Sequence, residues 1–216
     1  MMRIQGLRFT YPGWPETLRG VDLEVAAGES AFLLGPSGCG KSTLLRCVAG
    51  LETGYTGRVL LDGTPLDDLP PQRRRIGMLF QEPALFPHLD VWQNVAFGLR
   101  YLDVPRDQWR EEAGRWLDLV ELDGRADARV DELSGGQRQR VALARTLAAR
   151  PRAVLLDEAF SALDRDLRDA LGPRVKTLLR DQGVPALWVT HDRDEAQRLG
   201  DRVWALVDGR VQSQDR

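Results

Sequence analysis

One segment, residues 35–42, constrains the fold of this chain more than any other, and it reads Gly35-Pro36-Ser37-Gly38-Cys39-Gly40-Lys41-Ser42. This spacing matches the pattern of a phosphate-binding loop. An apolar run, residues 30–34, precedes the segment, and residues 41–50 have helical character, so it lies between a buried strand and a helix. The glycines allow backbone N–H groups to approach phosphate oxygens, and the helix N-terminus adds partial positive charge.

The polar residues of this loop and of a second acidic motif predict nucleotide chemistry. Lys41 is long enough to reach the β- and γ-phosphates, and the Ser42 hydroxyl is suited to Mg²⁺. The apolar run Leu155-Leu156 ends at Asp157, which we expect beside the loop in the Mg²⁺ shell, and Glu158 is placed to polarise an attacking water. The alternative is a strand that ends at a solvated acidic turn. The loop alone identifies only a nucleoside triphosphatase.

The bulk composition limits the other function classes. The 216 residues suggest one domain or one domain with an inserted lobe, and the formal net charge of −2 argues against a dedicated nucleic-acid binder. We interpret Arg73-Arg74-Arg75 as a solvated face. Cys39 and Cys47 lack metal-ligand spacing, which favours a reducing compartment, and Cys39 is the thiol that we expect to react with alkylating reagents.

The hydrophobic pattern of the sequence changes twice along the chain. Residues 90–150 have a helical pattern, whereas the segments before and after them contain short runs of strand character. No run approaches the ~20 apolar residues of a spanning helix. Gly172-Pro173 should kink or split a helix expected over residues 167–180. The strands are expected at 3–9, 21–25, 30–34, 58–61, 153–156 and 186–189.

The segment Leu133-Ser134-Gly135-Gly136-Gln137, with the arginine-rich residues 138–145 after it, resembles the signature of ATP-binding cassette (ABC) ATPases. Physically it is a glycine turn before a helix, with Ser134 as N-cap, and such a helix N-terminus can bind phosphate. The resemblance implies that the signature closes over ATP held by another subunit, in a head-to-tail homodimer or a heterodimer with a related ATPase.

Four further residues resemble site residues of that family. Tyr11 resembles the aromatic residue that stacks on adenine, although a packing role is the alternative. Gln81 resembles the glutamine that contacts Mg²⁺ or the attacking water. Asp164 lies in a loop that resembles the one coupling the two ATP sites across the dimer. His191 resembles the histidine that contacts the γ-phosphate. The same resemblance implies that ATP is cradled by Gly35, Pro36, Ser37, Gly38, Cys39, Gly40, Lys41, Ser42 and Thr43 and by Ser134, Gly135, Gly136 and Gln137 of the second subunit.

The resemblance covers essentially the whole chain and implies a fold. We expect an α/β P-loop NTPase (RecA-like) core with an N-terminal antiparallel β subdomain and an inserted α-helical subdomain. The expected single ABC ATPase domain spans 1–216, with the core over 1–88 and 151–216 and the helical insertion over 89–150. One departure is Ala159, which stands where importers commonly have proline.

The direction of transport rests on resemblance as well. Residues 79–89, which contain the apolar stretch 83–89, and residues 94–99 resemble bacterial importers of thiamine, molybdate, iron and polyamines. This implies transmembrane permease subunits, a substrate-binding protein, and a cytoplasmic chain peripheral on the inner face of the membrane, with no nucleic acid. The alternatives are an exporter, a non-transport ABC ATPase acting on nucleic acid or ribosomes, and a P-loop kinase or GTPase. The sequence does not identify the solute.

Overall fold

The computed structural model describes residues 1–213 and divides into two compact units. The first, here called the core unit, comprises Met1–Met78, Arg152–Glu158 and Val175–Arg216. The second, here called the helical unit, comprises Leu79–Pro151 and Ala159–Arg174. The helical unit therefore contains all of residues 89–150 together with the flanking segment 79–88 and the segment after Glu158.

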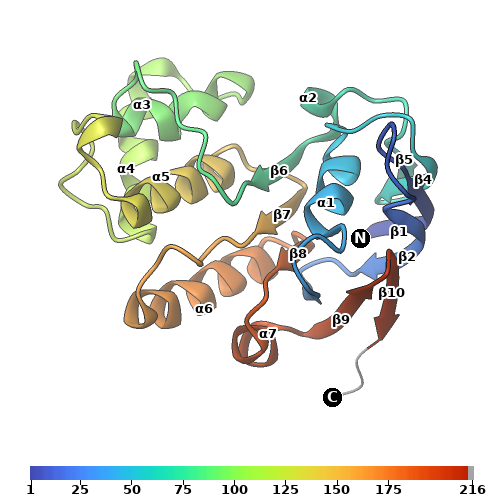
Figure 1. Cartoon of the computed structure of the whole chain (residues 1–216). Coiled ribbons are helices and arrows are strands. Elements are labelled where there is room, and N and C mark those ends of the chain that lie inside the picture. The colour runs from blue at the N-terminus through green and yellow to red at the C-terminus, as the bar shows by residue number, and fades with distance from the viewer. Residues whose placement is uncertain (214–216) are drawn as a thin grey trace. The chain divides into compact units, whose positions relative to one another are not determined.

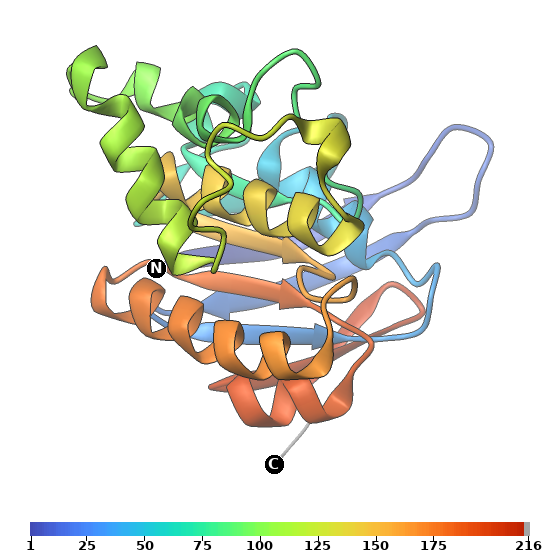
Figure 2. The same ribbon diagram turned by 90° about the vertical axis from the view of Figure 1, so that its left-hand side faces the viewer.

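A six-stranded sheet carries the core unit, in the order β10-β9-β3-β8-β7-β6. Strand β3 pairs in parallel with β8 and β9, and β7 pairs in parallel with β8, so these four strands end at the same edge. Figure 2 shows the arrows of β3, β7 and β8 pointing the same way. The strands are β3 (Ser30–Leu34), β6 (Ile76–Leu79), β7 (Ala153–Asp157), β8 (Ala186–Val189), β9 (Arg202–Val207) and β10 (Arg210–Ser213). The strands expected at 30–34, 153–156 and 186–189 are confirmed, and every residue of β3, β7 and β8 is buried.

A second, antiparallel sheet completes the core unit, in the order β2-β1-β4-β5. Its strands are β1 (Met2–Phe9), β2 (Leu18–Val25), β4 (Thr56–Leu61) and β5 (Thr64–Pro65). Asp62 and Gly63, with φ of 50° and 77°, form the tight turn between β4 and β5. Asp-Gly favours this left-handed geometry.

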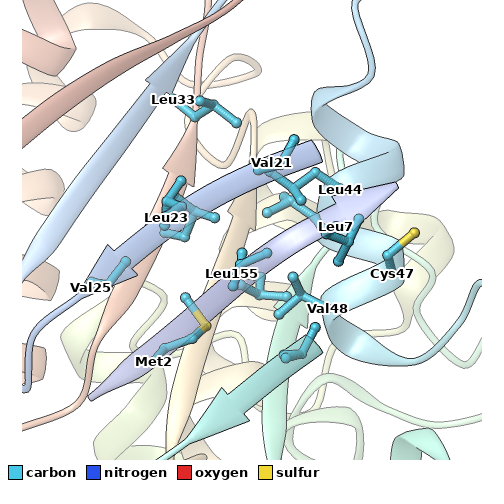
Figure 3. Packing of buried hydrophobic residues seen from close by; sticks show 14 of the residues in the cluster. Met2, Leu7, Val21, Leu23, Val25, Leu33, Leu44, Cys47, Val48 and Leu155 are labelled. Carbon is cyan, nitrogen blue, oxygen red and sulfur yellow. The ribbon is translucent and has the colours of Figure 1, made fainter. Parts of the chain in front are cut away.

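Helix α1 (Lys41–Ala49) packs its apolar face into the core between these sheets (Figures 1 and 3). Leu44, Cys47 and Val48 of this helix lie in one buried cluster with Leu7 and Leu155 of the neighbouring strands. Burial of such side chains contributes roughly 1.5–3 kcal/mol each relative to exposure. The cluster fixes the position of α1, which follows β3 in the chain. The N-terminus of the helix therefore lies at the carboxyl edge of the parallel strands.

Arg74, at the end of the short helix α2 (Pro71–Arg74), caps the other end of α1. Its side chain is only 3% exposed, and its guanidinium donates to the Cys47 and Val48 carbonyls, both at 3.0 Å. It also donates to the Leu69 and Asp67 carbonyls and to the Tyr55 hydroxyl. The interpretation of Arg73-Arg74-Arg75 as a solvated face is therefore wrong for Arg74, because a helix C-terminus presents carbonyls that need donors. Arg73 and Arg75 are exposed.

The helical unit packs three helices against one another, α3, α4 and α5 (Figure 1). Its elements are α3 (Val91–Ala96), α4 (Trp109–Leu119), α5 (Gly135–Ala148) and the 3-10 helices η1 (Phe97–Tyr101), η2 (Arg106–Gln108) and η3 (Val130–Glu132). Among the described residues, no helix is long and apolar enough to cross a membrane.

The segment after residue 164 forms a single helix, α6 (Arg165–Asp181), and a short helix α7 (Arg193–Leu199) follows β8. Pro173 lies inside α6, so of the kink or split expected at Gly172-Pro173 the split does not occur. Leu171, Val175 and Leu179 are buried on both sides of the proline. Tertiary packing of these side chains outweighs the lost backbone hydrogen bond.

The cap on α1 gives a first prediction. Replacing Arg74 by methionine keeps much of the side-chain length but removes the five hydrogen bonds that the guanidinium donates, so we expect the free energy of unfolding to fall by about 3 kcal/mol or more. Urea denaturation followed by circular dichroism measures this loss. The matched Arg73→Met variant, at an exposed neighbouring position, should change stability by less than about 0.5 kcal/mol; an equal loss in both variants would contradict the capping role.

Candidate functional site

The loop between β3 and α1 is closely packed at two of its glycines. A Cβ atom at Gly35 would lie 2.6 Å from the Leu206 carbonyl oxygen, which leaves no room for a side chain. Gly40 is the N-cap of α1 with φ of 103°, a left-handed conformation that favours glycine. These two positions hold the loop over the N-terminus of α1, where backbone N–H groups can receive an anion.

Lys41 lies over this loop. Its side chain is only 7% exposed, and Nζ donates to the Gly35 carbonyl at 2.8 Å and to the Pro36 carbonyl at 2.9 Å. The Cys39 sulfur is 3.9 Å from the same nitrogen. The ammonium group is therefore positioned by the loop that would surround a phosphate, and its bonds to neutral carbonyls can be exchanged for stronger bonds to phosphate oxygens.

Asp157, the last residue of β7, is bonded to the first turn of α1. Its side chain is 5% exposed, and the Ser42 hydroxyl donates to its carboxylate. Burial raises the pKa of the Asp157 carboxyl above its ordinary value, the Ser42 hydrogen bond opposes this, and the neighbouring Glu158 raises it further. The negative charge of this buried carboxylate is only partly offset by the hydrogen bond from Ser42. The carboxylate and the hydroxyl together provide hard oxygen ligands. This donor set fits Mg²⁺, which uses one or two carboxylates and keeps waters or phosphate oxygens in its remaining positions.

Glu158 and His191 meet just beyond the ends of two neighbouring strands, β7 and β8. Glu158 has φ of 48°, and its backbone N–H donates to the Val189 carbonyl at 2.9 Å. This left-handed turn, strained for a residue other than glycine, directs the chain out of the sheet. The Glu158 carboxylate oxygen Oε1 lies 3.5 Å from Nδ1 of the exposed His191. The two side chains form a pair in which the imidazole can orient the carboxylate.

Two residues beside His191 were not identified from the sequence. The buried Thr190 hydroxyl accepts a hydrogen bond from the Asp192 N–H at 3.1 Å. The Asp192 carboxylate accepts from the N–H groups of Asp194 and Glu195 and caps helix α7. An aspartate three residues before a glutamate is the sequence pattern of a helix N-terminus, and this signal could have identified Asp192.

Tyr11 lies just after β1 and is half-buried. Its ring meets the Phe9 ring edge-on at 4.7 Å between centroids, and its hydroxyl donates to the Glu52 carboxylate at 3.1 Å. These contacts agree with the packing alternative for Tyr11, and stacking on adenine stays a prediction.

The signature residues lie in the helical unit. Ser134 is the N-cap of α5: its hydroxyl accepts from the Gln137 N–H at 3.2 Å, and the Gln137 side chain accepts from the Ser134 N–H at 2.9 Å. A Cβ at Gly136 would lie 3.0 Å from the Ala162 carbonyl oxygen, whereas a Cβ at Gly135 would have no described atom within 4 Å apart from its chain neighbours and the nearby backbone of α5. The predicted capping by Ser134 is confirmed.

The structure thus gathers the predicted site residues in two groups. Tyr11, residues 35–43, Asp157, Glu158 and His191 belong to the core unit, whereas Gln81, residues 134–137 and Asp164 belong to the helical unit. The Asp164 carboxylate accepts from the Leu167 N–H at 2.9 Å and caps the start of α6. The catalytic and binding roles of all these residues stay predictions.

Comparison with known proteins gives concordant matches. Residues 18–161 match the family model described as "ABC transporter". The spermidine/putrescine import ATP-binding protein PotA of Acidothermus cellulolyticus is 53% identical over 190 residues, which cover 88% of this chain and 50% of that protein. The protein of the same name from Ruegeria pomeroyi is 45% identical over 209 residues, covering 96% and 57%. The chain spans about half the length of these curated relatives.

Among solved structures, the chain is similar to the dimeric post-hydrolysis state of the ATP-binding cassette MJ0796 bound to ADP and Pi. The TM-score is 0.92 at 33% sequence identity, over 100% of this chain and 98% of that one. A second structure, a dimer of the same bacterial ABC transporter cassette, gives the same values.

The buried carboxyl of Asp157 gives a second prediction. Because its folded-state pKa is raised, ionisation at neutral pH destabilises the folded state, and this penalty disappears as the pH falls below the pKa of the unfolded chain. We expect Asp157→Asn to raise the free energy of unfolding at pH 7, and the difference from wild type to shrink at pH 4. Urea denaturation in EDTA without nucleotide measures both. The exposed Asp118→Asn should leave stability unchanged, and a destabilised Asp157→Asn protein at pH 7 would contradict a destabilising effect of the buried carboxylate.

The two cysteines give a third prediction, with one serving as control for the other. Cys39 is partly exposed in the loop, whereas Cys47 is fully buried in α1 and burial raises its pKa to about 12. We expect iodoacetamide to label Cys39 and spare Cys47 in the native protein, as read by peptide mass spectrometry. ATP should slow the labelling of Cys39. Equal labelling of both thiols, or no protection by ATP, would contradict the position assigned to the loop.

Proposed function

The chain belongs to the ABC transporter family, and we propose that it is the ATP-binding and ATP-hydrolysing subunit of an importer. One observation carries this proposal: Lys41, the Ser42–Asp157 pair and the Glu158–His191 pair lie at the carboxyl ends of neighbouring parallel strands. Open parallel sheets bind their ligands at this edge. A lysine, a hydroxyl and carboxylates at a phosphate-binding loop suit phosphoryl transfer to water.

ATP binds with its phosphates in the loop of residues 35–43. Backbone N–H groups at the start of α1 surround the phosphate oxygens, and Lys41 exchanges the Gly35 and Pro36 carbonyls for the β- and γ-phosphates. Ser42, Gln81 and Asp157 would hold Mg²⁺. The metal, when bound, neutralises charge that develops on the phosphate oxygens.

Glu158 acts on the attacking water. Its carboxylate accepts a hydrogen bond from the water and takes the proton as the oxygen attacks the γ-phosphorus and the bond to the β-phosphate oxygen breaks. His191, 3.5 Å from the Glu158 carboxylate, orients it and reaches the γ-phosphate. The products are ADP and inorganic phosphate. Catalysis comes from positioning and charge stabilisation, because the protein forms no covalent bond to the substrate.

Two chains act as a head-to-tail pair. Ser134, Gly135 and Gly136 of one chain close over the γ-phosphate held by the other, with Gln137 and Asp164 at the same interface, and Tyr11 stacks on the adenine of its own nucleotide. The dimeric form of the similar cassette bound to ADP and Pi supports such a pair. A homodimer and a heterodimer with a related ATPase both satisfy this geometry.

The pair drives transmembrane permease subunits, supplied with solute by a binding protein, from the cytoplasmic face of the membrane. The names of the relatives support import over export and over a role on nucleic acid or ribosomes, and they make spermidine and putrescine the first solutes to test. The net charge of −2 also disfavours a nucleic-acid role. A guanine nucleotide is disfavoured because the chain lacks the Asn-Lys-x-Asp motif.

A fourth prediction tests the general base. Glu158→Gln keeps the size of the side chain and one acceptor oxygen but cannot take a proton, so turnover should fall by about 100-fold or more while ATP binding persists. Phosphate release and the fluorescence of a labelled ATP measure the two quantities, and size-exclusion chromatography with ATP should show a dimer. Glu111→Gln, on the exposed face of α4, is the matched control. Full activity of Glu158→Gln would exclude Glu158 as the base.

The same variant tests the transport claim. Because it retains ATP, tagged Glu158→Gln protein purified from detergent-solubilised membranes should bring down a multi-spanning permease, identified by mass spectrometry. Recovery of ribosomes, DNA or only soluble proteins would leave the ATPase assignment intact and overturn the assignment to transport.

A further inference from the structure

Helix α5, which begins at the signature, holds the loop around Gln81 at two points. The loop meant here is residues 80–86, the Gln81 loop. The Gln139 side chain donates to the Phe80 carbonyl at 3.3 Å, and the Arg145 guanidinium donates to the Ala84 carbonyl at 2.9 Å. These carbonyls lie on either side of Gln81 in the sequence. All of these residues belong to the helical unit, so the contacts lie within one compact body.

The two contacts differ in burial: the Gln139–Phe80 bond is partly buried, whereas the Arg145–Ala84 bond lies at the surface. Gln139 is only 1% exposed. Arg145 is half-buried, its guanidinium carbon lies 5.3 Å from the centre of the Phe86 ring, and desolvation lowers its pKa. A hydrogen bond in a low-dielectric environment is electrostatically stronger than one in water, which favours the bond made by the buried Gln139 side chain. The Gln81 loop is therefore constrained to move with α5.

The far end of the Gln81 loop is fixed by α3. Asn94, which is fully buried, accepts from the Phe86 N–H at 2.8 Å and donates to the Phe86 carbonyl at 3.1 Å. Two helices of the same unit thus hold the loop from both ends.

The amide oxygen of Gln139 has a further property. It is buried, and no donor among the described residues lies within hydrogen-bond distance of it. A buried polar atom without a partner costs free energy in the observed arrangement. A small shift of the loop that brings an N–H group to this oxygen would remove that cost, so the contact is suited to two alternative positions of the loop.

We propose that Gln139 and Arg145 are positioning residues that link the signature to Gln81. This proposal rests on the proposed function, in which the signature contacts ATP bound to the partner. Gln81 contacts the Mg²⁺ or the attacking water at the ATP bound to its own chain. Engagement of the signature displaces α5, and the two side chains carry this displacement to the loop and to Gln81. Each chain then couples its partner's nucleotide to its own, and ATP hydrolysis is cooperative.

A fifth prediction follows from removing each link separately. In Gln139→Leu and in Arg145→Met, we expect the Hill coefficient for ATP hydrolysis to fall towards 1 and kcat to fall by about 5-fold or more, the lower range of measured couplings between sites. The dissociation constant of labelled ATP, measured on dilute monomer, should stay within about 2-fold of wild type, since both residues belong to the helical unit and the phosphate-binding loop belongs to the core unit. Arg145→Lys keeps a donor and should recover part of the cooperativity.

Arg140→Met is the matched control. Arg140 also lies on α5 and is half-buried, but it donates to the Val120 and Glu121 carbonyls at the end of α4 instead of to the Gln81 loop. This variant should keep the wild-type Hill coefficient. Wild-type Hill coefficients in both Gln139→Leu and Arg145→Met, or non-cooperative hydrolysis by the wild-type protein, would overturn the proposal. Absence of ATP hydrolysis in the wild type would instead overturn the proposed function.

Discussion

The capture of helix α1 at both ends is the interaction on which the rest of this structure depends. Its side chains are buried between two sheets, its first turn is bonded to Asp157, and its last carbonyls are bonded to Arg74. A helix so held cannot tilt away when an anion binds at its N-terminus. The backbone donors of the loop are therefore arranged before the phosphate arrives, and this preorganisation is what makes electrostatic stabilisation effective.

The same arrangement carries a cost at the carboxyl edge of the sheet. Asp157 is kept buried beside Glu158, and Glu158 occupies a strained backbone conformation. Neither feature favours folding, and both place oxygen atoms where a cation and a water molecule are needed. Sites of this kind trade stability for function, and the apolar cluster around α1 offsets the loss.

Much of the core unit could be predicted from local signals. Strands β3 and β8 were located at both ends because short apolar runs are bounded by turns and polar residues, and the phosphate loop was identified by its glycine spacing. Arg74 was missed because neighbouring arginines are alike in sequence, and only tertiary packing buries one of them. Gln139 and Asn94 were missed for the same reason. The split expected at Pro173 does not occur, because the packing that keeps α6 in one piece involves residues distant in the sequence.

The requirement for glycine at position 135 can come from a neighbouring molecule and not from the fold of the chain itself. The isolated chain has space for a side chain there, so nothing in its own packing selects glycine. If another chain closes on that surface, the selection acts on the assembly, and denaturation experiments on the free protein are blind to it. A glycine of this type can reflect the close approach of a neighbouring chain. A search for assembly surfaces can therefore begin from glycines that the packing of the isolated chain does not explain.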